Sequence, residues 1–342
     1  MKEIGSEFWK IELENFNNNL DFINLGKDYQ LLMSGRTAID FVINDFQDEL
    51  KIVYMPNYCC ESMMQPFIDN GYKIVYYDFD YQEKRYIINP DINCSVFFAM
   101  SYFGYCDSYM DNIIEEFSNK KTIVIEDITH RLLSDNNHCM KSDYLICSLR
   151  KWFPIISGGV AIKKTSNFNH DTSNYKVDDF LVTTKEKAMK LKKYYIEGLI
   201  DTKGEFLNLY KESNNRFLNY KNKKIDNISL NILKHLNIAN IKAKRISNSL
   251  IIEKMLDNNK NIEMLFKYKK GDCPLFVPIL IKNRDIIRKK MIEKSIYLPV
   301  HWPNNKTENK IYDLELSLIN DQRYDDKDIK KYINELIKTL GD

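Results

Sequence analysis

The sequence predicts an α/β protein with a mostly parallel sheet in a large domain and a smaller α+β domain at the C-terminal end. Two observations predict it. Between residues 36 and 164, short runs rich in β-branched and aromatic residues alternate with segments of helical periodicity. Beyond about residue 175 the segments become long, lysine-rich and helical, and the last hundred residues alternate again. We therefore expect a large domain over 1–235 and a small one over 236–342.

The individual elements follow from these runs. Strands of a parallel sheet that helices cover on both faces are short and continuously apolar. In the large domain the predicted strands are 50–56, 72–80, 95–104, 121–127, 144–149 and 159–164, with helices at 37–46, 62–71 and 109–120 between them. In the second half we expect helices at 185–199, 230–256, 284–294 and 326–340, and strands at 275–281, 296–302 and 313–319.

Composition excludes several classes of protein. Lys+Arg 50 against Asp+Glu 48 gives a net charge of +2, which argues against nucleic acid or an acidic membrane surface as partner. No apolar run reaches membrane-spanning length, and the start lacks the basic and apolar regions of a signal peptide. Seven cysteines without C-x-x-C spacing favour a reduced, cytoplasmic protein, and five dispersed histidines predict no metal site.

Three features lie where strands end or helices begin. Lys151 follows the predicted strand 144–149, and Asp127 ends the strand 121–127. Residues 34–37, Ser-Gly-Arg-Thr, stand at the start of a helix, whose free N–H groups favour a phosphate. Ligands of open α/β sheets gather beyond the carboxyl ends of the strands. An amine, a carboxylate and an anion cradle together meet the needs of pyridoxal phosphate.

Each feature also has a purely structural interpretation. Most lysines are surface residues, so Lys151 alone indicates little. Asp127 could cap the helix that follows it, and residues 34–37 could form a simple N-cap turn. Only the order and spacing of the three along an α/β chain favour a shared cofactor site.

The same segments resemble a known family. "SGRTA" (34–38), "IEDITH" (125–130) and "SLRK" followed by "SGG" (148–159) are similar to the DegT/DnrJ/EryC1/StrS sugar aminotransferases, which have the type I aminotransferase fold and use pyridoxal phosphate. The resemblance covers nearly the whole chain. It continues through the segments 54–67, 101–117, 241–256 and 317–333.

The resemblance implies a role for each site residue. Lys151 would form the Schiff base with the cofactor and carry the proton during catalysis. Asp127 would pair with the pyridinium nitrogen, and His130 would lie on the O3′ side of the ring. The residues implied for the cofactor's phosphate are Gly35, Arg36 and Thr37, with Ser148 as a further candidate.

Some positions stay open. Tyr58 or Cys60 occupies the region where the family supplies a ring-stacking residue, and Tyr58 could instead pack in the core. The family's serine five residues before the lysine is replaced by Ile146. The family's G-x-N-Y-R segment, which reaches the partner subunit's cofactor, is not evident, and residues 174–176 match it poorly. His301 and Trp302 either line the substrate entrance or are partly buried.

The resemblance implies an aminotransferase that moves an amino group from an amino acid such as glutamate to a keto-sugar, nucleotide-linked, for surface polysaccharides or secondary metabolites. It also implies a homodimer. A sugar dehydratase on the same scaffold is an alternative, although the resemblance predicts a histidine in place of Lys151 there. A non-catalytic binding protein with the same fold is the second alternative.

Overall fold

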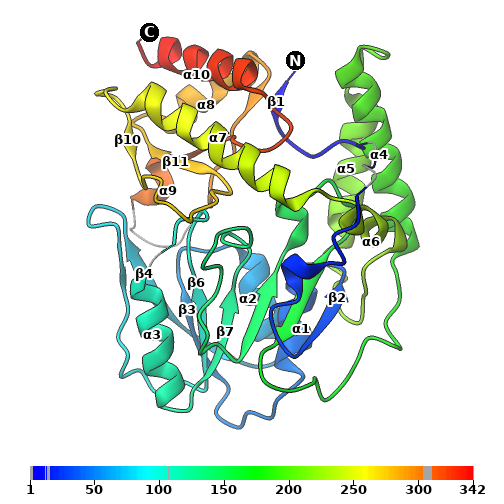
Figure 1. The fold of residues 1–342 in the computed structure, drawn as a ribbon, viewed down its shortest axis with the longest axis vertical. Coiled ribbons are helices and arrows are strands. Elements are labelled where there is room, and N and C mark those ends of the chain that lie inside the picture. The colour runs from blue at the N-terminus through cyan, green and yellow to red at the C-terminus, as the bar shows by residue number, and fades with distance from the viewer. Residues whose placement is uncertain (1–2, 12, 14–15, 107, 303–309, 342) are drawn as a thin grey trace.

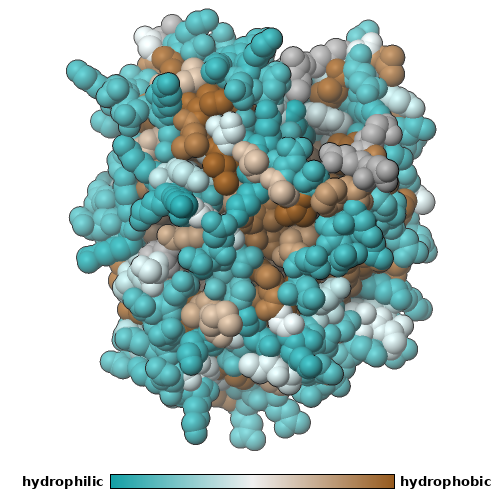
Figure 2. Space-filling view, viewed as in Figure 1, coloured by the Kyte–Doolittle hydropathy of each residue, from teal (hydrophilic) through white to brown (hydrophobic). Residues whose placement is uncertain are grey.

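The computed structural model describes residues 3–11, 13, 16–106, 108–302 and 310–341. An eight-stranded sheet forms the larger part of the molecule, and the C-terminal helices and short strands lie together at one end of it (Figure 1). Hydrophilic residues cover most of the face in Figure 2, with hydrophobic ones near its middle. In the described part of the chain, no helix combines the length and apolarity that a membrane crossing needs.

The large sheet has the strand order β2-β9-β8-β7-β6-β3-β4-β5. The five strands from β8 to β4 are parallel, while β9, β2 and β5 join through antiparallel pairs. All six strands predicted for this region are confirmed, and β2 and β5 were not predicted. The strands are β2 Asp28–Leu32, β3 Ile52–Pro56, β4 Lys73–Asp80, β5 Arg85–Ile87, β6 Val96–Met100, β7 Ile123–Asp127, β8 Tyr144–Cys147 and β9 Gly159–Lys163.

The predicted helices of the large sheet are present, but one predicted helix is divided. Residues 230–256 form α6 and α7 because the Asn237 side chain caps α7, accepting a hydrogen bond from the Asn240 N–H at 3.0 Å. The α-helices are α1 Gly35–Ile43, α2 Glu61–Asp69, α3 Ser108–Asn119, α4 Asp179–Glu197, α5 Gly204–Arg216, α6 Asn227–Lys234, α7 Ile238–Leu256, α8 Arg284–Glu293, α9 Ile311–Leu314 and α10 Asp326–Gly341.

The C-terminal part contains two small sheets. An antiparallel one joins β10 Glu263–Met264, β11 Val277–Leu280 and β13 Glu315–Leu318. In the other, β1 Ile4–Gly5 pairs in parallel with β12 Ile296–Tyr297, so the predicted strand 296–302 is only two residues long. The start of the chain thus pairs with its C-terminal part, and the domain boundary at 235 stays a prediction.

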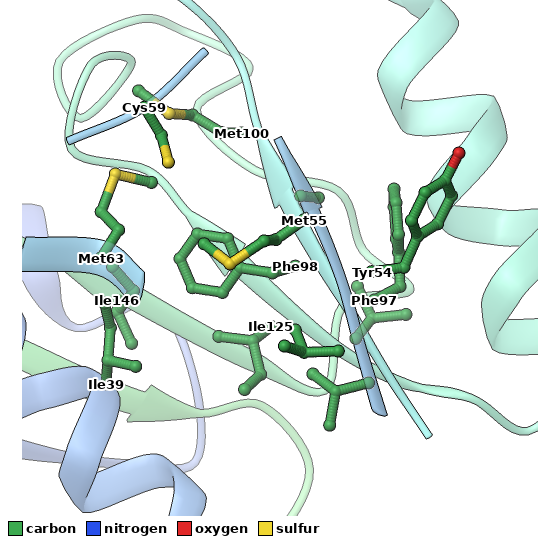
Figure 3. Close-up of a cluster of buried hydrophobic side chains, with 14 of the residues drawn as sticks. Ile39, Tyr54, Met55, Cys59, Met63, Phe97, Phe98, Met100, Ile125 and Ile146 are labelled. Atoms are coloured by element: carbon green, nitrogen blue, oxygen red, sulfur yellow. The ribbon is translucent and has the colours of Figure 1, made fainter. Parts of the chain in front are cut away.

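The main core lies between α1, α2 and the central strands. Figure 3 shows Ile39 of α1 and Met63 of α2 near Met55, Phe98 and Ile146 of the sheet. These strands are buried along nearly their whole length, which explains their continuously apolar sequences. The core therefore fixes the strands whose carboxyl ends carry the candidate site.

A close backbone contact joins β9 to the start of α1. The Gly158 N–H donates to the Met33 carbonyl at 2.7 Å, and a Cβ on Gly159 would lie 2.2 Å from the Ser34 carbonyl oxygen. Only glycine at 159 allows this approach. The contact holds the first turn of α1 beside the loop that carries Lys151.

We expect Gly159→Ala to lower the free energy of unfolding by about 1–3 kcal/mol, because the added Cβ overlaps backbone that cannot move freely. Urea unfolding measures it. Gly204→Ala is the matched control: nothing lies within 4 Å of the added Cβ at the start of α5, so a change within about 0.5 kcal/mol is expected. Equal stability of the two variants would contradict the contact.

Candidate active site

A cavity of about 350 Å³ opens at the carboxyl ends of β6, β7 and β8, within the size range of small-molecule sites. Met100, Asp127 and Ile146 occupy neighbouring positions of these strands in register. The start of α1 and the end of α5 close other sides. The lining residues are Ser34, Gly35, Arg36, Ile39, Cys60, Ser62, Met63, Met100, Asp127, Thr129, His130, Ile146, Ser148, Arg150, Lys151, Asn214, Phe217 and Trp302.

Asp127 is a buried carboxylate at the end of β7. Burial raises its pKa to about 6, against a hydrogen bond from the Thr129 N–H at 2.8 Å and the positive charge of Lys151. A buried carboxylate with a raised pKa is stabilised in its ionised form by a positive charge next to it. Asp127 is therefore suited to face a cationic ring nitrogen.

His130 is neutral and its tautomer is fixed by the backbone. Burial, with the charge of Lys151, lowers its pKa to about 3. Its Nδ1 accepts a hydrogen bond from the Phe103 N–H at 3.0 Å, so the ring proton is on Nε2. The ring lies nearly parallel to Trp302, with centroids 5.8 Å apart. His130 can thus donate one hydrogen bond through Nε2.

Thr129 connects the turn after β7 to the lysine loop. Besides its bond to Asp127, its Oγ1 accepts from the Ser148 N–H at 2.9 Å, and its carbonyl accepts from Trp152 Nε1 at 2.6 Å. Lys151 follows in the short 3₁₀ helix Leu149–Lys151 and is solvent-exposed. These bonds set the position of Lys151 relative to Asp127.

The first turn of α1 offers backbone N–H groups to the cavity. The Ser34 side chain caps the helix, accepting from the Thr37 N–H at 3.2 Å. Gly35 keeps this turn close to the lysine loop, since a Cβ there would lie 3.1 Å from Ser148 Cβ. A helix start of this kind binds anions.

Two arginines meet at the same side of the cavity. Arg36 Nη1 donates to the Phe217 carbonyl at 3.2 Å, and Arg150 Cζ lies 3.7 Å from the centre of the Phe217 ring. Among the described residues, the Nε atoms of both are buried without a hydrogen-bond partner. Burial lowers the pKa of Arg150 to about 10, and the charge of Arg36 adds to this effect. Buried donors and like charges around a cavity fit a bound phosphate.

Most of the predicted site residues line this one cavity. They are Gly35, Arg36, Cys60, Asp127, His130, Ser148 and Lys151. Thr37 is buried behind the helix start, where its hydroxyl lies 3.0 Å from Ser34 Oγ. Tyr58 is buried among Phe79, Tyr102, Trp302 and Tyr312, and its hydroxyl donates to the His301 carbonyl. Of the two stacking candidates, Cys60 borders the cavity.

Sequence reasoning missed several lining residues. Thr129 and Arg150 each stand next to a predicted residue, and this adjacency was the only available signal. Asn214 and Phe217 come from the end of α5, far along the chain, and nothing in their local sequence marks them. Of the two residues left open at the entrance, Trp302 lines the cavity and His301 is buried.

No protein-family model and no curated protein matches the chain. Solved structures do. Helicobacter pylori PseC, an aminotransferase involved in the biosynthesis of pseudoaminic acid, aligns over 99% of this chain and 100% of its own with a TM-score of 0.66 and 14% identity. A DegT DnrJ EryC1 StrS aminotransferase from Brucella abortus aligns over 96% of this chain and 92% of its own, with a TM-score of 0.64 and 14% identity.

A third match is NtdA from Bacillus subtilis with bound cofactor PMP, over 93% of this chain and 74% of that one, with a TM-score of 0.61 and 16% identity. At these identities the comparisons show the fold. The chain has the type I aminotransferase fold of these proteins, and the resemblance predicted from sequence is confirmed at that level.

We expect Asp127→Asn to stabilise the cofactor-free protein by about 2–3 kcal/mol at pH 7. The pKa of Asp127 is raised to about 6 in the folded protein, so the ionised carboxylate destabilises the fold above that pH. Below about pH 4 the group is protonated in both states and the gain disappears. Urea unfolding at pH 4, 5, 6 and 7 measures this difference.

Glu49→Gln at an exposed position is the control, with a change within about 0.5 kcal/mol across the range. A pH-independent difference between the wild type and Asp127→Asn would contradict the strained burial of Asp127.

Proposed function

We propose that this protein is a pyridoxal-phosphate-dependent aminotransferase. The observation that carries the proposal is one cavity where Lys151, the buried Asp127 and two arginines meet. Among the described residues, the buried Nε atoms of Arg36 and Arg150 have no hydrogen-bond partner. An amine, a carboxylate that needs a cationic partner and an anion cradle are the three groups that this cofactor requires. The fold shared with solved aminotransferases supports the proposal.

Each residue has a distinct part. Lys151 would hold the cofactor covalently, and its exposed amine could carry a proton at the cavity. Asp127 would keep the pyridine nitrogen protonated. His130 would offer its Nε2 proton to an oxygen of the cofactor. The bound cofactor supplies the electron sink, which no side chain of the chain offers.

A separate set of residues would bind the phosphate group of the cofactor. We place this phosphate at the start of α1, where Gly35 lies close to Ser148 and Arg36 lines the same cavity. The contribution of Ser148, three residues before Lys151, is part of the proposal. Thr37 would act there only through the cap that it forms with Ser34.

For the substrates we propose a keto-sugar acceptor, nucleotide-linked, and glutamate or a similar amino acid as donor. The support is the sugar-pathway role named for PseC and the resemblance of the sequence to sugar aminotransferases. Retention of Lys151 favours transamination over a sugar dehydratase. A binding role without chemistry is the other outcome that the following experiment separates.

The purified protein, loaded with pyridoxal phosphate, should carry the cofactor covalently at Lys151 after borohydride reduction, as peptide mass spectrometry can show. Lys151→Ala should lose this label and at least about 100-fold in rate, because among the described residues no other lysine lines the main cavity. Lys187→Ala, exposed on α4, serves as the control.

The amino donor and the keto-sugar acceptor are tested in two separate half-reactions. Glutamate alone should convert the cofactor to its amine form, with one equivalent of 2-oxoglutarate released. A keto-nucleotide-sugar should then restore the aldehyde form and emerge aminated. If saturating amino acids cause no spectral change while the cofactor stays on Lys151, the aminotransferase function is refuted in favour of a binding role.

We also propose a homodimer. Helices α4 and α5 pack against each other at one side of the molecule (Figure 1) and leave Leu199, Leu207 and Phe180 of this region exposed. A second copy of the chain could cover such apolar side chains. Light scattering at micromolar concentration should give twice the chain mass of 40.6 kDa, and a fully active monomer would disprove the dimer.

A further inference from the structure

A second, smaller cavity adjoins the active-site cavity on the other side of the lysine loop. Its volume is about 140 Å³, several times what a single water needs. It shares Ser148, Arg150 and Lys151 with the larger cavity, and Lys185 of α4 and Glu7 of the N-terminal segment line its far side. Any group bound here would therefore touch the lysine loop directly.

Lys185 is buried at this cavity without a partner. Only 4% of its surface is exposed, and among the described residues its ammonium group has no hydrogen bond or ion pair. Burial lowers its pKa to about 8; the carboxylates of Glu7 and Asp226 oppose the shift, and the charges of Arg150 and Lys151 add to it. A buried, unpaired ammonium group destabilises a fold unless an anion meets it.

Arg150 and Lys185 are brought together by one aromatic ring. The Lys185 Nζ lies 5.3 Å and the Arg150 Cζ 3.7 Å from the centre of the Phe217 ring. A ring face attracts cations, so Phe217 holds two like charges near each other. The unpartnered Nε of Arg150 adds a buried donor at the same place.

The carboxylates near this cluster neutralise it only in part, because Glu7 and Asp226 oppose the lowering of the Lys185 pKa without cancelling it. Glu7 Oε1 accepts a hydrogen bond from Asn214 Nδ2 at 3.1 Å, which uses part of its capacity as an acceptor. At the cavity wall, three cationic side chains, Arg150, Lys151 and Lys185, thus face one carboxylate. The cavity has an excess of positive charge and unused donors.

We infer that Lys185 and Arg150 form a second anion subsite, which binds a carboxylate or phosphate group of the substrate beside Lys151. The subsite shares Arg150 with the larger cavity but adds Lys185, which does not line that cavity. The identification of its occupant as a substrate group rests on the proposed function. The occupant must be small, since the cavity has less than half the volume of its neighbour.

Calorimetric titration of the cofactor-loaded protein tests the subsite, because the cofactor's own phosphate then occupies the α1 cradle. The probes are 2-oxoglutarate for a carboxylate source and inorganic pyrophosphate for a phosphate source. We expect at least one to bind to the wild type and Lys185→Met to bind it about 10- to 100-fold more weakly, as the loss of a charged hydrogen bond predicts. Lys187→Met, two residues further along α4 and exposed, should bind as the wild type does.

Two further readouts separate a binding role from a structural one. Lys185→Met should retain full cofactor content, and its melting temperature without ligands should stay equal or rise by up to about 4 °C, since a buried unpaired charge is removed. Lys185→Gln provides the same binding test if the methionine variant does not fold.

The inference is overturned if neither probe binds to the wild type, or if the Lys185 variants bind the probe as tightly as the wild type does. It is also overturned if these variants lose both the cofactor and anion binding, or if their melting temperatures fall. Failure of the proposed function is recognised separately. In that case the wild type does not load pyridoxal phosphate, and the same titrations of the cofactor-free protein still show whether anion binding depends on Lys185.

Discussion

The hydrogen bonds of Thr129 hold the candidate site together. The Thr129 hydroxyl accepts a hydrogen bond from the Ser148 N–H of the lysine loop. The Thr129 N–H donates to the Asp127 carboxylate, and the Thr129 carbonyl accepts from the indole N–H of Trp152. All of these groups are shielded in the core, where a lost partner costs about 1–3 kcal/mol. These bonds therefore fix the backbone of the lysine loop relative to Asp127, and the side chain of Lys151 carries the amine from there.

The site is built from groups that oppose folding. A carboxylate, two guanidinium groups and an ammonium group are taken out of water without full partners, and each is held there by apolar packing from the strands and from Phe217. Proteins tolerate such burial where a ligand later completes the charges. The continuous core beneath the strand ends offsets this destabilisation.

Sequence reasoning found the groups attached to strand ends, because a strand end is marked by the apolar run before it. Asp127 and Lys151 were identified in this way, and the strands themselves are confirmed. Lys185 lies on α4, which contains several other lysines, so nothing in the local sequence distinguishes this buried lysine from its exposed neighbours. Phe217 directly follows α5 and likewise carries no local signal. The division between α6 and α7 depends on one cap at Asn237, a short-range signal inside a longer helical pattern.

The pairing of β1 with β12 has a consequence for the order of folding. Ile4 meets Ile296, and the Gly5 N–H donates to the Tyr324 hydroxyl at 2.8 Å, so these contacts join the two most distant parts of the described sequence. Contacts of such sequence separation form late, because a long loop must close first. Glu7 directly follows β1 and borders the second cavity. A chain still emerging from the ribosome can assemble the strand ends with Asp127 and Lys151, and the hydrogen bond from Asn214 can already hold Glu7 beside them. Strand β1, in contrast, meets its partner only after synthesis has passed residue 296.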